Sequence, residues 1–97
     1  IAHLLNYPNP CSSHTTFVFE HNRVDELLDL QIDIYSLNGQ LVHSISKSIV
    51  SSGFREVSTK WYIEESIPKG IYLYKLKVQS QFDESIIEKT EKLIILR

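Results

Sequence analysis

The chain has 97 residues, which suits one domain, and 42% of them are hydrophobic, which is enough for a core and excludes a disordered chain. Its net charge of −2, with lysines and arginines scattered singly, excludes a nucleic-acid-binding face, because such a face needs clustered positive charge. Cys11 is the only cysteine, so an internal disulfide is excluded as well. Because the chain contains no methionine, we expect residues 1–97 to be a single domain excised from a larger protein.

The N-terminal part of the chain predicts a bend followed by a strand. Residues 7–10, Tyr-Pro-Asn-Pro, predict a rigid bend, because each proline fixes φ and disfavours helix in the residue before it. Residues 15–20 predict a strand with Phe17 and Phe19 facing the core, and residues 22–27 predict a helical turn or a loop.

A period of two governs the next segment. Apolar residues occupy the even positions of 28–35, and this alternation predicts a half-buried strand. Asn38-Gly39 then predicts a hairpin with a type I′ turn, in which both residues have positive φ. The following strand, 41–49, is predicted to place its odd-numbered side chains on one face and its even-numbered side chains on the other.

The second half of the chain continues the alternation. Residues 51–53 predict a turn, residues 55–63 a strand, and Ile67-Pro68-Lys69-Gly70 a type I turn. Residues 71–78 form the clearest predicted strand, with the even positions on one face. Residues 79–85 predict a polar loop and residues 86–97 the final strand.

Tyr72 begins a predicted strand directly after a turn. In sandwich domains a tyrosine in this position often forms a tyrosine corner, in which its hydroxyl bonds back to the backbone. Together with about seven short strands, this pattern predicts an all-β fold, an immunoglobulin-like antiparallel β-sandwich.

The residues that could carry chemistry do not form a catalytic or metal-binding motif. Cys11 and His14 have a spacing that zinc ligands use, but the sequence offers no second ligand pair, so we predict no metal and no cofactor. Cys11 also lacks a helix N-terminus that would lower its pKa, so we do not expect it to act as a nucleophile. The domain is therefore predicted not to be an enzyme.

Aromatic residues leave one alternative open. Trp61, Tyr72 and Tyr74 would suit a platform for sugar rings if they were exposed, which would make the domain a fibronectin-like or carbohydrate-binding accessory module of an extracellular hydrolase. Aromatic residues at alternating strand positions are more often part of a core, so their burial decides this point.

Four motifs follow one another along the chain: Tyr-Pro-Asn-Pro at 7–10, Tyr-Ser-Leu-Asn-Gly-Gln-Leu-Val at 35–42, Gly-Ile-Tyr-Leu-Tyr-Lys-Leu at 70–76 and Lys-Leu-Ile-Ile-Leu at 92–96. In this order they resemble a known family, the C-terminal sorting domain of the type IX secretion system of Bacteroidetes. Residues 16–23 resemble, more narrowly, the C-terminal domain of the system's gingipain-like sortase, a cysteine endopeptidase. The chain departs from many members at Trp61, which is followed by Tyr62-Ile63 where they carry Trp-Asp-Gly.

The resemblance implies a recognition module whose partners are the type IX translocon and an outer-membrane β-barrel shuttle protein, PorV-like. It further implies export across the outer membrane to the cell surface, and retention of the domain if the parent is the sortase. The final strand is expected to offer unpaired backbone groups and apolar side chains to a partner. The residues expected to bind the partner are Asn38, Gly39, Gly70, Lys92, Leu93, Ile94, Ile95, Leu96 and Arg97.

Overall fold

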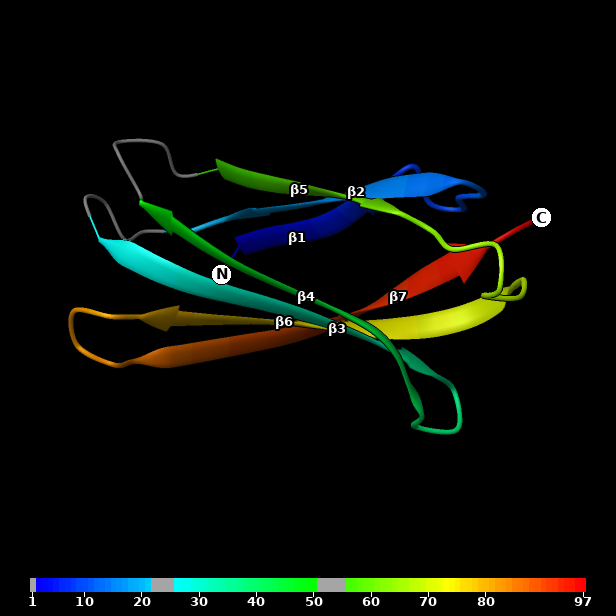
Figure 1. Cartoon of the computed structure of the whole chain (residues 1–97). Coiled ribbons are helices and arrows are strands. Elements are labelled where there is room, and N and C mark those ends of the chain that lie inside the picture. The colour runs from blue at the N-terminus through cyan, green and yellow to red at the C-terminus, as the bar shows by residue number, and fades with distance from the viewer. Residues whose placement is uncertain (1, 22–25, 51–55) are drawn as a thin grey trace.

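The chain folds into two packed antiparallel sheets, as a computed structural model that describes residues 2–21, 26–50 and 56–97 shows (Figure 1). The seven strands are β1 (Ala2–Tyr7), β2 (His14–Glu20), β3 (Leu27–Ser36), β4 (Leu41–Val50), β5 (Glu56–Tyr62), β6 (Gly70–Ser80) and β7 (Ile86–Ile95). The predicted turn at 51–53 and most of the predicted turn or loop at 22–27 lie outside the described residues.

The strand order confirms the predicted antiparallel sandwich. One sheet has the order β1-β2-β5 and the other the order β4-β3-β6-β7, and Figure 1 shows them as two layers. The fourth strand, β4, pairs with β3. In constant immunoglobulin domains the fourth strand belongs instead to the sheet that contains the first strand, so that this sheet has four strands and the other has three. The described residues contain no helix that could span a membrane.

The core lies between the sheets and follows the predicted alternation. Phe17 and Phe19 of β2 face it, as do the even-numbered residues of β3 from Leu28 to Ile34. The even-numbered residues of β6 and, from β7, Leu93 and Ile95 complete it. The space between the two sheets is therefore filled by side chains that the period of two already places on one face of each strand.

The hairpin between β3 and β4 differs from the predicted type I′ turn. Gly39 has φ 87°, whereas Asn38 has no positive φ, and the Gly39 backbone N–H donates to the Ser36 carbonyl at 3.0 Å. This geometry is a three-residue loop, in which a turn precedes a left-handed glycine. The Asn38 side chain explains the difference, because its Oδ1 accepts bonds from the Gln40 N–H at 3.2 Å and from the Ser36 hydroxyl.

The predicted face of β4 is wrong at its first residue. Ile34 pairs with His43, but Tyr35 pairs with Leu41, so the register shifts by one residue at this point. A β-bulge places two residues of one strand opposite one residue of the other and so reverses the side-chain alternation beyond it. Leu41 therefore points outward and is 53% exposed, whereas Val42 and Ile45 pack against the core.

The connection between β5 and β6 contains a turn that lies earlier than predicted. The Ile67 N–H donates to the Glu64 carbonyl at 3.0 Å, and Gly70 is already the first residue of β6, where it pairs with Ile95. β6 also continues to Ser80, two residues beyond the predicted strand end.

The predicted tyrosine corner is confirmed. Tyr72 is buried, and its hydroxyl donates to the Pro68 carbonyl at 2.6 Å. This bond ties the start of β6 to the connection that precedes it.

The aromatic side chains that could have formed a sugar platform belong to the core. Trp61, Tyr72 and Tyr74 are 4%, 5% and 1% exposed. The ring centroids of Phe17 and Tyr74 lie 4.8 Å apart. The hypothesis that these three residues form a sugar-binding platform is therefore wrong, because their rings are not accessible to a ligand.

We predict that Tyr72→Phe lowers the free energy of unfolding by about 1 kcal/mol, because the variant keeps the ring and loses only the bond to the Pro68 carbonyl. Tyr62→Phe is the matched control, since Tyr62 is 69% exposed and should tolerate the change. Urea unfolding of both variants measures the difference, and equal midpoints would contradict the role assigned to the Tyr72 hydroxyl.

Candidate functional site

The terminal strand β7 is an edge strand, but the structure contradicts the expectation that residues 93–96 offer unpaired backbone groups. Cys11 forms a parallel bridge with Ile95. Its N–H donates to the Ile94 carbonyl at 2.9 Å, and its carbonyl accepts the Leu96 N–H at 2.8 Å. The edge of the sheet is therefore already occupied here by a segment from the other end of the chain.

The Asn9 side chain continues this coverage. Its Nδ2 donates to the Lys92 carbonyl at 3.2 Å, and its Oδ1 accepts the Ile94 N–H at 3.1 Å. An amide that donates and accepts in this way takes the place of the backbone of a neighbouring strand. We refer to residues 9–11 as the edge cover.

Buried polar contacts hold the edge cover in place. Asn6 and Thr15 are buried, and Asn6 Nδ2 donates to Thr15 Oγ1 at 3.1 Å. The Thr15 hydroxyl donates to the Pro8 carbonyl at 2.9 Å, and Asn9 Nδ2 donates to Asn6 Oδ1 at 3.1 Å. Because each of these groups has a partner, the bend at 7–10 presents Asn9 to β7 in one orientation.

Cys11 has a structural role in this arrangement. Its side chain is 3% exposed, and its thiol donates to the Ile94 carbonyl at 3.4 Å. Burial raises the pKa of the Cys11 thiol, and the positive charge of Arg97 offsets part of that rise. A neutral, buried thiol is a poor nucleophile. Within the described ranges, no group of three histidine, cysteine or acidic residues could hold a metal ion.

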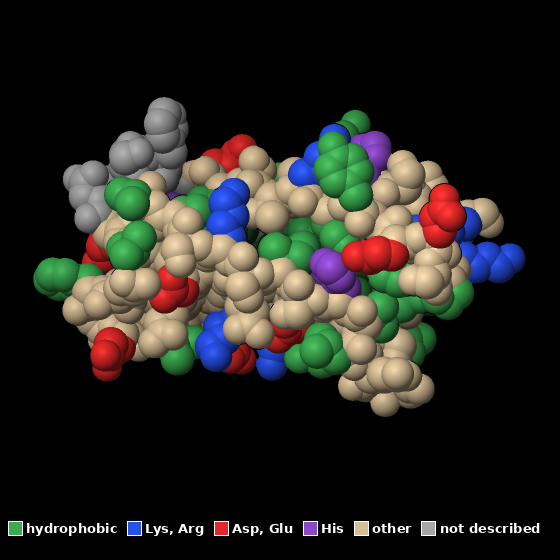
Figure 2. Space-filling view, viewed as in Figure 1, with side chains coloured by type: hydrophobic (Ala, Val, Ile, Leu, Met, Phe, Trp, Pro, Cys, Tyr) green, Lys and Arg blue, Asp and Glu red, His purple; other side chains and the backbone are tan. Residues whose placement is uncertain are grey.

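Apolar side chains gather on the outer face of the four-stranded sheet, at the end where the chain terminates. Tyr35 pairs with both Leu41 and Leu73, which places these three outward-facing side chains in one row across β4, β3 and β6. Ile71 pairs with Ile94 in the next row. Figure 2 shows hydrophobic side chains at the surface in this part of the molecule. We call the following residues the terminal patch: Leu37, Leu41, Ile71, Leu73, Ile94 and Leu96.

The residues predicted to bind a partner lie in and around the terminal patch. Asn38 and Gly39 form the hairpin loop between Leu37 and Leu41 of the patch. Gly70 pairs with Ile95, and Lys92 pairs with Leu73, so both lie beside the patch. Leu93 and Ile95 have no exposed surface and face the core, whereas Ile94 is partly exposed and Leu96 is 56% exposed.

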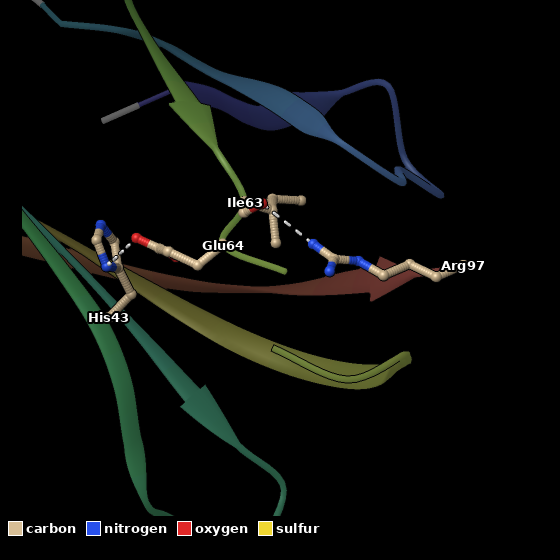
Figure 3. Close-up of polar contacts among 4 residues, drawn as sticks. All are labelled: His43, Ile63, Glu64 and Arg97. Atoms are coloured by element: carbon tan, nitrogen blue, oxygen red, sulfur yellow. Dashed lines mark hydrogen bonds and ion pairs between the residues drawn. The ribbon is translucent and has the colours of Figure 1, made fainter. Parts of the chain in front are cut away.

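The C-terminal residue anchors this end of the domain to the β5–β6 connection. Arg97 donates from Nη2 to the Ile63 carbonyl at 3.2 Å (Figure 3). In the same connection, Glu64 Oε1 lies 3.3 Å from His43 Nδ1 of β4, as Figure 3 also shows. The His43 ring stacks on Trp61 with the ring centroids 5.1 Å apart. These contacts join β4, β5 and the chain terminus beside the patch.

A hollow of about 370 Å³ separates the β3–β4 hairpin from the β5–β6 connection. Its lining includes the patch residue Leu41 and the tyrosine corner formed by Pro68 and Tyr72. The patch is therefore continuous with a concave surface at the same end of the sandwich.

Reasoning from the sequence missed two parts of this site. The pairing of Asn9 with β7 had no local signal, because the bonded residues are 83 and 85 positions apart. Part of the terminal patch did have a local signal, since Ile71 and Leu73 are apolar residues on the outer face of β6. Leu41 had none, because the β-bulge beside Tyr35 reverses the face on which it lies.

The comparisons with known proteins agree with one another. Residues 6–95 match the family described as secretion system C-terminal sorting domain. Among solved structures, the chain is similar to the dimeric latent PorU from Porphyromonas gingivalis, with a TM-score of 0.81 and 28% sequence identity. That similarity covers 96% of this chain and 9% of the PorU chain. No curated protein matches the chain.

The two faces of β7 predict different costs for two leucine substitutions. Leu93→Ala should lower the free energy of unfolding by about 2–5 kcal/mol, because the side chain is fully buried. Leu96→Ala should change it by about 0.5 kcal/mol or less, because the side chain is more than half exposed and only its backbone bonds to Cys11. Thermal unfolding monitored by circular dichroism compares the two, and similar losses would contradict this division of the strand.

Proposed function

Because the chain belongs to the family of C-terminal sorting domains of the type IX secretion system, we propose that it directs its parent protein across the outer membrane by presenting the terminal patch to the secretion machinery. Sorting domains of this family are not catalytic. The domain acts in this proposal as a recognition surface, and any chemistry belongs to the rest of the parent protein.

The observation that carries the proposal is the convergence of three separate motifs on one surface. The motifs at 35–42, 70–76 and 92–96 each contribute apolar residues to the terminal patch. Strand pairing places Leu41 and Leu73 in one row and Ile71 and Ile94 in the next. Exposed apolar residues that cluster in this way are typical of protein interaction sites. Scattered exposed apolar residues would carry no such meaning.

The edge cover determines which groups of this surface a partner could contact. With the backbone of Ile94 bonded to Asn9 and Cys11, the end of β7 is closed to an added strand, and its side chains project from a fixed backbone. Recognition through side chains on a preformed surface avoids the entropic cost of ordering a flexible segment. The partner in this proposal therefore contacts Ile94 and Leu96 through their side chains.

An outer-membrane β-barrel shuttle protein, PorV-like, is the proposed partner, together with the translocon. The similarity to PorU supports a sortase-like cysteine endopeptidase as the parent protein. In such a parent the domain would be retained at the cell surface, where it would tether the enzyme to the shuttle barrel. The alternative of a sugar-binding module loses its support, because its three aromatic residues are buried.

We predict that Leu41→Ser combined with Leu73→Ser reduces surface delivery of a reporter fused upstream of the domain. Each substitution removes part of an apolar contact, and ~1.4 kcal/mol is enough for a tenfold loss of affinity. Delivery should therefore fall about tenfold in a host that has the secretion system. The melting temperature should stay close to that of the wild type, because both side chains are exposed.

Val50→Ser is the matched control for this experiment. Val50 is 68% exposed at the opposite end of β4, outside the patch, so its delivery should equal that of the wild type. Normal delivery of the double variant would contradict a role for the patch.

An antibody against the domain, applied to the native parent protein, tests whether the domain is retained. Recovery of the domain from the medium as a free fragment would contradict the proposed tether.

A further inference from the structure

The edge of β7 is covered over only part of its length. Bonds to Asn9 and Cys11 show that the backbone groups of Lys92, Ile94 and Leu96 point away from β6. Because β7 pairs with β6 without a register shift, the same alternation turns the backbone groups of residues 86, 88 and 90 to the free side. No strand of the described residues pairs with that side of 86–90.

The charges on β7 are antisymmetric about Thr90. The sequence from 86 to 94 reads Ile-Ile-Glu-Lys-Thr-Glu-Lys-Leu-Ile. Two residues that lie equally far from Thr90 on its two sides therefore carry opposite charges at one and at two positions away. In an antiparallel pair of identical strands centred on Thr90, Glu88 lies opposite Lys92 and Lys89 lies opposite Glu91. Ile86 then lies opposite Ile94 and Ile87 opposite Leu93, so each directly opposed pair is complementary.

Neighbouring registers lack this complementarity. In a two-fold antiparallel pair the central residue always faces its own copy. A centre at residue 88, 89, 91 or 92 would therefore place two glutamates or two lysines directly opposite each other, which is destabilising. Only Thr90 is uncharged within this stretch, so the charge pattern selects one register.

Inside the domain, these charges face β6 only loosely: Glu88 lies opposite Lys77 and Glu91 opposite Tyr74. No ion pair between described residues involves Glu88, Lys89, Glu91 or Lys92, and Glu88, Thr90 and Lys92 are exposed. An edge strand with free backbone groups and a self-complementary charge pattern fits a second copy of the same strand better than an unrelated peptide.

We propose that β7 is a self-recognition edge, through which two copies of this chain pair antiparallel about Thr90 in competition with the edge cover. Full pairing needs the Lys92 carbonyl and the Ile94 backbone groups, which Asn9 and Cys11 occupy. The covered chain is therefore a monomer, and release of residues 9–11 permits the dimer. This inference rests on the β7 edge and not on the proposed role of the terminal patch.

A disulfide trap tests the register directly. In the Cys11→Ser background, Thr90→Cys places two thiols opposite each other across the two-fold axis, where Cα atoms of a bonded antiparallel pair are about 5.5 Å apart and within disulfide range. Ser46→Cys, at an exposed position of the other edge strand of the sheet, is the matched control. The covalent dimer should form faster with Cys at 90 than at 46, and Asn9→Ala should raise its rate about tenfold, because two bonds of the cover are lost.

Charge variants in the Thr90→Cys chain complete the test. Lys92→Glu should suppress the covalent dimer, because it places glutamates opposite each other, and Glu88→Lys combined with Lys92→Glu should restore it. Equal rates at positions 90 and 46, or equal rates for the single and double charge variants, would overturn the proposal. The charge variants keep Asn9, so they decide the matter even if Asn9→Ala does not fold.

Discussion

The side chain of Asn9 and the edge of β7 form the interaction on which the rest of this structure depends. One amide group donates to the Lys92 carbonyl and accepts the Ile94 N–H, and Cys11 continues the contact two residues later. These bonds join the two sheets along one side and bring residues near both ends of the chain together. An edge strand that ended here without them would expose backbone donors and acceptors to any neighbouring chain.

The cover gives the terminal strand two separate roles. Leu93 and Ile95 point into the core, and Ile94 and Leu96 point outward into the terminal patch. Since the backbone between them is bonded on both sides, the outward side chains are held in register with Ile71 and Leu73. A sorting domain built in this way offers a surface with a fixed shape, and in the proposed function its stability and its recognition depend on alternate residues of one strand.

The sequence predicted those parts of the fold that depend on local patterns. The alternation in β3 and β6 identified their buried faces. The position of Tyr72 after a turn predicted a bond from its hydroxyl back to the backbone, and the acceptor is the Pro68 carbonyl. The turn at Asn38-Gly39 was misassigned because a side-chain bond from Asn38 changes the backbone conformation.

The parts of the site that the sequence did not predict depend on contacts between distant residues. Pairing of Asn9 with Ile94 joins residues 85 positions apart, and nothing in the proline-rich bend identifies its partner. The terminal patch likewise appears only when strand pairing places Leu41, Leu73 and Ile94 at one end of one face. Three of the four motifs that revealed the family contribute residues to the terminal patch, but none of them shows the surface alone.

Amide hydrogen exchange along the outer edge of β7 tests the central claim most directly. The N–H groups of Glu88, Thr90, Ile94 and Leu96 all point away from β6, and only those of Ile94 and Leu96 have partners in the edge cover. The account predicts strong protection at Ile94 and Leu96 and fast exchange at Glu88 and Thr90 in the monomeric protein. Fast exchange at all four amides would contradict it, because the edge of the terminal strand would then be open along its whole length.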